Sequence, residues 1–142
     1  MTTDPTQHEA TLAFYEANAK RYFDSTIRLN MTMIYTAFLT YMPTYASILD
    51  AGCGSGRDTL YFSKRGYQVT AFDYSASMVK LASGLTGQNV LQLSFQEIDF
   101  DDHFNGVWAC SSLIHLALDE LHEVISKLSM AMVVDGVMYA SF

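Results

Sequence analysis

The sequence predicts an α/β fold, a doubly wound and mainly parallel sheet with helices on both faces. Three observations predict it. From residue 46 onward, short apolar segments alternate with segments of helical periodicity. The first apolar segment runs into a glycine-rich turn that opens a helix. The chain has 142 residues, enough for one domain but not for two.

Two helices are expected before any strand. Thr6 and Glu9 form a capping-box pattern, which predicts a first helix that runs to about Phe23. A second helix is expected over 27–41, ended by Pro43. Because both precede the sheet, residues 1–44 are expected to form a helical cap or lid, and 45–142 the core of a single domain.

The core elements follow in alternation, with Ser75 as the expected N-cap of one helix and Asp135-Gly136 as the end of another. The expected strands are 47–50, 68–72, 90–93, 106–110 and 137–142, and the expected helices are 57–65, 75–85 and 118–132. The last strand is apolar, and nothing follows to cover it. Three interpretations stay open: pairing with a second copy, cover by the N-terminal helices, or a chain that is a fragment.

Charge and composition narrow the partners. The formal net charge is −7, and residues 97–142 carry eight acidic side chains against Lys127 alone. Without clustered cations, binding to nucleic acid or to an anionic membrane surface is disfavoured. No apolar run is long enough to span a membrane and no secretory signal is present, so a cytoplasmic protein is expected.

Neither a disulfide framework nor a metal site is expected. Cys53 and Cys110 are too few for a framework and lack the spacing of zinc ligands. The acidic residues of 97–102 are expected to form a solvated loop, because cation-binding loops need a denser ligand arrangement.

The segment 48–58, Ile-Leu-Asp-Ala-Gly-Cys-Gly-Ser-Gly-Arg-Asp, carries the strongest functional signal. Its glycines let the backbone turn sharply and bring a ligand against main-chain N–H groups and a helix start. The spacing is GxGxG, which differs from a dinucleotide site. Asp50 at the strand end would repel a pyrophosphate but suit a ligand that carries positive charge.

The chain resembles the class I S-adenosylmethionine-dependent methyltransferases. The resemblance rests on this motif, on Asp73 at the end of the second strand, and on the order of the later segments. The resemblance implies a Rossmann-like sheet of order 3-2-1-4-5, without the last two strands of the family's seven. It also implies S-adenosylmethionine (SAM) as cofactor and S-adenosylhomocysteine (SAH) as product. The cofactor-binding residues it implies are Tyr22, Asp50, Ala51, Gly52, Cys53, Gly54, Gly56, Asp58, Asp73, Tyr74, Met78, Gln96, Glu97, Cys110 and Ser111.

Individual roles follow from the same resemblance. Asp50 would hold the methionine ammonium, Asp73 the ribose hydroxyls, and Gln96-Glu97 the adenine edge. The backbone at Cys110 and Ser111 would face the methyl group. Asp58 would orient the methionine end, or would only favour the start of its helix.

His115 is the candidate catalytic residue, either as a general base or as a group that orients the acceptor. The alternative is a polar residue at the pocket rim without a role in proton transfer. Three further histidines, His8, His103 and His122, are expected at the surface.

The expected function is methyl transfer to a small-molecule acceptor by in-line displacement at the methyl carbon. The alternatives are a non-catalytic SAM-binding protein or fragment, and another SAM-using enzyme, such as a lyase or an aminopropyl transferase. Only methyl transfer would yield SAH.

Overall fold

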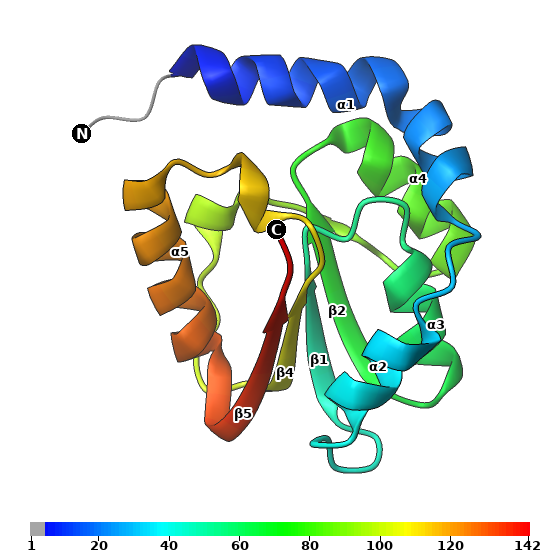
Figure 1. Cartoon of the computed structure of the whole chain (residues 1–142), viewed down its shortest axis with the longest axis vertical. Coiled ribbons are helices and arrows are strands. Elements are labelled where there is room, and N and C mark those ends of the chain that lie inside the picture. The colour runs from blue at the N-terminus through cyan, green and yellow to red at the C-terminus, as the bar shows by residue number, and fades with distance from the viewer. Residues whose placement is uncertain (1–4) are drawn as a thin grey trace.

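The computed structural model describes residues 5–142, and it contains one sheet of five parallel strands. Their order is β3-β2-β1-β4-β5, so the predicted α/β fold and strand order are confirmed (Figure 1). The strands are β1 Ser47–Ala51, β2 Gln68–Asp73, β3 Leu91–Gln92, β4 Phe104–Ala109 and β5 Met132–Ala140.

Helices cover both faces of this sheet because adjacent strand residues point to opposite sides. In β1, the buried Ile48 packs with Phe38 in one cluster, whereas the next residue, Leu49, packs with Val124 and Leu128 in another. The first face carries α2 Thr32–Leu39, α3 Arg57–Lys64 and α4 Ala76–Thr86, and the second carries α5 Leu118–Ala131.

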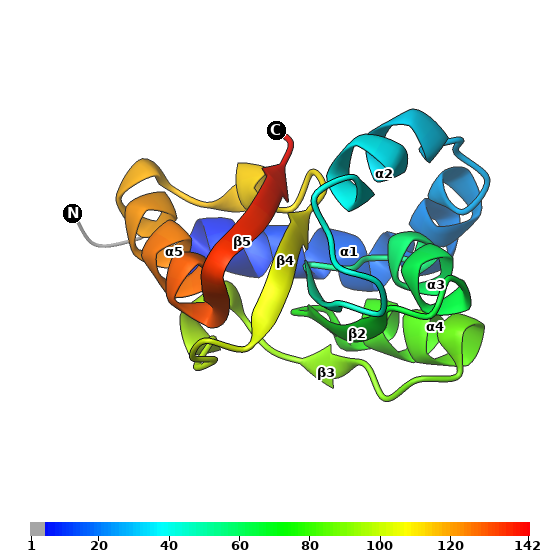
Figure 2. The same ribbon diagram turned by 90° about the horizontal axis from the view of Figure 1, so that it is seen from below.

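The N-terminal helix α1, Pro5–Thr26, lies across the carboxyl ends of the strands (Figures 1 and 2). It spans from the α5 side of the sheet to the α4 side. The helix begins at Pro5 and not after Thr6 as expected, and the Thr6 side chain on which the expected capping box depends lies outside the described part of the structure. Of the two helices expected as a cap, α1 alone has this position, because α2 buries Phe38 against the sheet.

The second helix begins later than expected, at Thr32. Thr26 does not cap it, because Thr26 belongs to α1 and its hydroxyl donates to the carbonyl of Tyr22 at 2.9 Å. The side chain of Asn30 accepts from the backbone N–H of Thr32 at 3.1 Å instead. The start predicted at residue 27 is therefore wrong.

Helix α5 passes directly into β5, without the turn expected at Asp135-Gly136. These two residues lie inside the strand, where Asp135 has a φ of 66° and the register with β4 shifts between Phe104 and Gly106. The β-branched pair Val133-Val134 favours an extended backbone from the helix end onward. The expected strand 137–142 is therefore wrong at both ends, since β5 covers Met132–Ala140.

Strand β5 is the last strand on its side of the sheet. Pairing of this edge with a second copy is untested and stays a prediction. Over residues 5–142, no helix is long and apolar enough to cross a membrane.

Candidate functional site

The loop between β1 and α3 is built from glycines with positive φ. Gly52 has a φ of 73° and Gly54 a φ of 53°. A Cβ at Gly52 would lie 2.5 Å from the Cβ of Ser112, and one at Gly54 would lie 3.2 Å from a ring carbon of Tyr22. The backbone of this loop therefore approaches two neighbouring segments more closely than other residues would allow.

Asp73, at the end of β2, holds this loop in place. Its Oδ2 accepts from the backbone N–H of Gly54 at 2.9 Å, and its Oδ1 accepts from that of Ser75 at 3.0 Å. Burial raises the pKa of the Asp73 carboxyl, while these backbone N–H groups act in the opposite direction. Ser75 in turn caps α4 by accepting from the N–H of Met78, as predicted.

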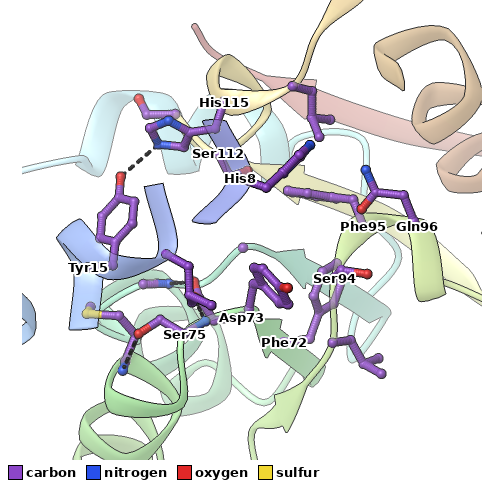
Figure 3. A pocket seen from close by; sticks show the side chains of 18 of the residues that line it. His8, Tyr15, Phe72, Asp73, Ser75, Ser94, Phe95, Gln96, Ser112 and His115 are labelled. Atoms are coloured by element: carbon purple, nitrogen blue, oxygen red, sulfur yellow. Dashed lines mark hydrogen bonds between the residues drawn. The ribbon is translucent and has the colours of Figure 1, made fainter. Parts of the chain in front are cut away.

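A cavity of about 390 Å³ opens beside this carboxylate, between the carboxyl ends of the strands and helix α1 (Figure 3). Ten of the predicted residues line it: Tyr22, Gly52, Gly54, Asp73, Tyr74, Met78, Gln96, Cys110, Ser111 and His115. They come from distant parts of the chain and meet because parallel strands end at the same edge of the sheet.

Six of the predicted residues are not among those that line the cavity: Asp50, Ala51, Cys53, Gly56, Asp58 and Glu97. Asp50 is fully buried beneath the loop, and its Oδ2 accepts from the hydroxyl of Thr59 at 2.6 Å. Burial raises the pKa of Asp50 to about 8, and the negative charge of Asp58 contributes in the same direction. Asp50 thus does not line the cavity in this structure, and its expected contact with the methionine ammonium stays a prediction.

Asp58 is the centre of a buried hydrogen-bond network that the sequence did not reveal. It accepts from the hydroxyl of Tyr35, from the indole N–H of Trp108 at 2.8 Å and from Nε of Arg57 at 2.8 Å. Arg57 also donates to the carbonyl of Thr26, at the end of α1, at 3.2 Å. Asp58 therefore connects α2, α3 and β4. It lies in the first turn of α3, which fits its expected role at the helix start, while its expected role toward the methionine end stays a prediction.

Glu97 ends a short 3₁₀ helix, η1 Phe95–Glu97, and is exposed. Its carboxylate accepts from the backbone N–H of Ser94 at 3.1 Å, and hydrogen bonds from Ser94 lower the pKa of Glu97. Glu97 does not line the cavity, so its expected adenine contact stays a prediction, whereas Gln96 and Phe95 do line the cavity.

Helix α1 contacts the other wall of the cavity through an aromatic pair. The hydroxyl of Tyr15 lies 2.8 Å from Nε2 of His115, which ends the 3₁₀ helix η2 Leu113–His115 (Figure 3). Burial raises the pKa of Tyr15 to about 12, with smaller contributions from Tyr22 and Asp73. Burial also lowers the pKa of His115, which outweighs the opposite effect of Asp73.

A second contact joins α1 to α5 at the far end of the cavity. Nε2 of His8 lies 2.9 Å from Oε1 of Glu120, and the side-chain amide of Gln96 donates to the same oxygen at 3.1 Å. The other oxygen of Glu120 accepts from the N–H of Ala117. His8, expected at the surface, is partly exposed and also lines the cavity.

A third contact joins α1 to the start of α4. The carboxylate of Glu16 accepts from the hydroxyl of Ser75 at 2.8 Å, from the backbone N–H of Ser77 at 3.1 Å and from the hydroxyl of Ser77. Hydrogen bonds from Ser77 and Ser75 lower the pKa of Glu16. Helix α1 is thus held at three points around the cavity.

Several lining residues had not been predicted: His8, Leu12, Phe72, Ser75, Leu93, Ser94, Ser112, Leu116 and Glu120. A signal for two of them was present in the sequence. His8, Leu12, Tyr15 and Tyr22 are spaced by four, three and seven residues, which places all four on one face of a helix. The strand-end residues had no such local signal. Among the residues described, no three His, Cys, Asp or Glu side chains are arranged as a metal site.

Comparisons with known proteins agree with this geometry. The model of a methyltransferase domain family matches residues 48–136. A malonyl-acyl-carrier-protein O-methyltransferase from Salmonella typhimurium is 36% identical over 89 residues, which are 57% of this chain and 35% of that protein. A magnesium-protoporphyrin O-methyltransferase from Rhodobacter capsulatus is 28% identical over 111 residues, 72% of this chain and 50% of that protein. The chain thus spans between a third and a half of the length of these two relatives.

Solved structures share the fold. A 1,6-didemethyltoxoflavin-N1-methyltransferase from Burkholderia thailandensis, with bound SAH, superposes with a TM-score of 0.77 at 23% identity, over 96% of this chain and 63% of that one. The complex of the protein DhpI with SAH gives a TM-score of 0.77 at 26% identity, over 96% of this chain and 69% of that one.

Proposed function

Because the chain belongs to this methyltransferase domain family, we propose that it binds SAM in the cavity under α1 and transfers the methyl group to a small-molecule acceptor. The observation that supports this most is Asp73, a partly buried carboxylate at the end of β2 that lines the cavity and is hydrogen-bonded to the glycine loop. A carboxylate in this position can accept both hydroxyls of a ribose. The cytoplasmic location expected from the sequence stays a prediction.

The residues around the cavity suit the parts of SAM. The glycine loop suits the methionine end of SAM, because Gly52 and Gly54 line the cavity and a side chain at either position would meet a neighbouring residue. Phe95, Met78 and Gln96 provide two apolar surfaces and an amide for the adenine. Asp50 and Glu97 do not line the cavity, and their expected roles at the methionine ammonium and the adenine edge stay predictions.

When bound, SAM supplies a methyl group on a sulfonium, which is already reactive. The residues mainly align the acceptor and exclude water. The acceptor's lone pair would form the bond to the methyl carbon while the carbon–sulfur electron pair would stay on sulfur, which leaves SAH. We assign His115 to receive the proton that the acceptor releases, because its ring lies at the cavity wall and its lowered pKa keeps it neutral near pH 7.

The test is calorimetric titration of the purified chain with SAM and, in parallel, with SAH. Both should bind saturably, and Asp73→Asn should weaken binding by at least about tenfold, because it removes charge-assisted hydrogen bonds. Asp99→Asn is the matched control: Asp99 is exposed and does not line the cavity, so its affinity should match the unmodified chain. A folded chain that binds neither compound would contradict the proposal.

Product analysis separates methyl transfer from the other uses of SAM. Formation of SAH together with a methylated acceptor supports the proposed reaction. Consumption of SAM without SAH would indicate a lyase or an aminopropyl transferase instead.

A further inference from the structure

The loop that follows β4 forms part of the cavity wall in an uncommon backbone conformation. Cys110 and Ser111 come directly after β4 and line the cavity. Ser111 has a φ of 51°, in the left-handed region that residues with a side chain rarely adopt. Such a conformation persists only where neighbouring groups hold it. The contacts that hold Ser111 therefore shape this part of the wall.

The hydroxyl of Ser141 contacts both residues of this loop. Its oxygen accepts from the backbone N–H of Ser111 at 2.8 Å, and it lies 3.3 Å from the hydroxyl oxygen of the same residue. It also donates to Sγ of Cys110 at 3.8 Å. Both lining residues thus share one hydrogen-bond partner, and that partner does not itself line the cavity.

The pairing of β4 with β5 places Ser141 beside this loop. Ser141 follows β5 directly, and its backbone N–H donates to the carbonyl of Ala109, the last residue of β4, at 3.1 Å. The register pairs Ala109 with Ala140, so the two chain segments leave the sheet side by side. For this reason Ser111 meets a residue that is 30 positions away in the sequence.

The conformation of Ser111 also sets the course of the chain toward the glycine loop. The hydroxyl of the next residue, Ser112, donates to the carbonyl of Ala51 at 2.7 Å. The Cβ of Ser112 is also the atom that a Cβ at Gly52 would approach to 2.5 Å. A different backbone conformation at Ser111 would move Ser112 away from both, because two dihedral angles per residue set the direction of the chain.

We propose that Ser141 is a positioning residue of the SAM site: its hydroxyl holds Ser111 in the left-handed conformation and so presets the cavity wall over residues 110–112 before the ligand binds. This inference rests on the proposed function, because it concerns the same cavity. Without the hydroxyl, the N–H of the exposed Ser111 would bond to water, and the residue could adopt the commoner backbone conformations. The ligand would then have to restore the wall when it binds, at a cost in affinity.

Titration of the purified chain with SAH tests this role through two variants of Ser141. Loss of one neutral hydrogen bond in Ser141→Ala should weaken SAH binding about three- to tenfold. Ser141→Thr keeps the hydroxyl, so it should bind SAH as the unmodified chain does. Ser126→Ala is the matched control and should leave the affinity unchanged, because Ser126 is exposed on α5 and does not line the cavity. Unchanged affinity in Ser141→Ala, or an equal loss in the alanine and threonine variants, would overturn the inference.

Amide hydrogen exchange of the ligand-free chain, followed by NMR, separates this inference from the proposed function. Exchange at the N–H of Ser111 should be faster in Ser141→Ala than in the unmodified chain and unchanged in Ser141→Thr, since the hydroxyl accepts from this N–H. Unchanged exchange in Ser141→Ala would show that Ser141 does not hold the wall.

The two measurements together distinguish the possible failures. If the unmodified chain does not bind SAH, the proposed function fails, and exchange at Ser111 still decides whether Ser141 holds the cavity wall. If SAH binds and Ser141→Ala keeps the full affinity, the proposed function stands and the role of Ser141 is wrong.

Discussion

Removal of one buried hydroxyl, in Tyr35→Phe, tests the network around Asp58. Tyr35 is 3% exposed, and its hydroxyl donates to Oδ1 of Asp58. The substitution should leave the ring in place, because that ring stacks on Tyr61 with centroids 3.9 Å apart. The change therefore removes one hydrogen bond to a buried carboxylate and little else.

The expected magnitude follows from that single bond. A hydrogen bond to a charged group contributes about 1.5–3 kcal/mol, so the free energy of unfolding should fall by about 2 kcal/mol. Asp58 keeps two donors, Arg57 and Trp108, and for this reason the upper end of the range is not expected. In a chain of this size the midpoint of thermal unfolding should fall by roughly 5–8 °C.

Urea denaturation of the variant and the unmodified chain measures the effect. Tyr41→Phe is the matched control, since Tyr41 is 70% exposed and its hydroxyl removal should change the free energy by less than about 0.5 kcal/mol. A Tyr35→Phe effect as small as that of the control would refute the structural role of Asp58. Asp58 does not line the cavity, so the affinity for SAH should stay near that of the unmodified chain. A loss of SAH affinity at unchanged stability would instead assign Asp58 to the ligand.

Three further predictions concern the loop, helix α1 and Asp50. Gly54→Ala should lower the free energy of unfolding by about 1–2 kcal/mol and weaken SAH binding, because Gly54 has a φ of 53°. Gly84→Ala is the control. It should be neutral or stabilising, because Gly84 lies inside α4 and no atom lies near the added Cβ. Glu16→Gln should increase amide hydrogen exchange in α1, whereas Glu9→Gln, at an exposed position of the same helix, should not. The pKa of Asp50 is raised to about 8 in the folded chain, above the ordinary value of about 4 that applies to the unfolded chain. Between these two values only the folded chain keeps the Asp50 carboxyl protonated. The free energy of unfolding should therefore decline as pH rises from about 4 to about 8. Unfolding titrations across this range should show a flatter dependence for Asp50→Asn, and an unchanged slope would contradict the raised pKa.

The strands and the glycine loop were predictable because their signals are local. Apolar segments followed by glycine or aspartate marked the ends of β1 and β2 within one or two residues. Once the strand ends were placed at one edge, ten of the predicted site residues met at the cavity. The spacing of His8, Leu12, Tyr15 and Tyr22 on one helix face carried a further, unused signal for the same cavity.

Element boundaries were less predictable where two local preferences competed. Asp135-Gly136 has the composition of a turn, yet it lies within β5 at a shift of register, because Val133-Val134 already extends the backbone. Threonine is a residue type that often caps a helix start, yet Thr26 lies at the end of α1, where its hydroxyl donates to the carbonyl of Tyr22. Contacts to other segments add to these local preferences: β5 pairs with β4 across this region, and Arg57 donates to the carbonyl of Thr26.

The sequence by itself determined the class of fold, the order of strands that the family resemblance implied, and Asp73 as a strand-end carboxylate. The tertiary structure alone decided which carboxylates face the cavity and which are buried behind it. Asp50 lies in β1 before the glycines and Asp58 in α3 after them, and both side chains are buried. Asp50 accepts from Thr59, and Asp58 accepts from its neighbour Arg57 and from the distant Tyr35 and Trp108. The physical reason is that a buried carboxylate takes the direction in which it finds hydrogen-bond donors, and for Asp58 two of those donors come from elements that only the fold brings close.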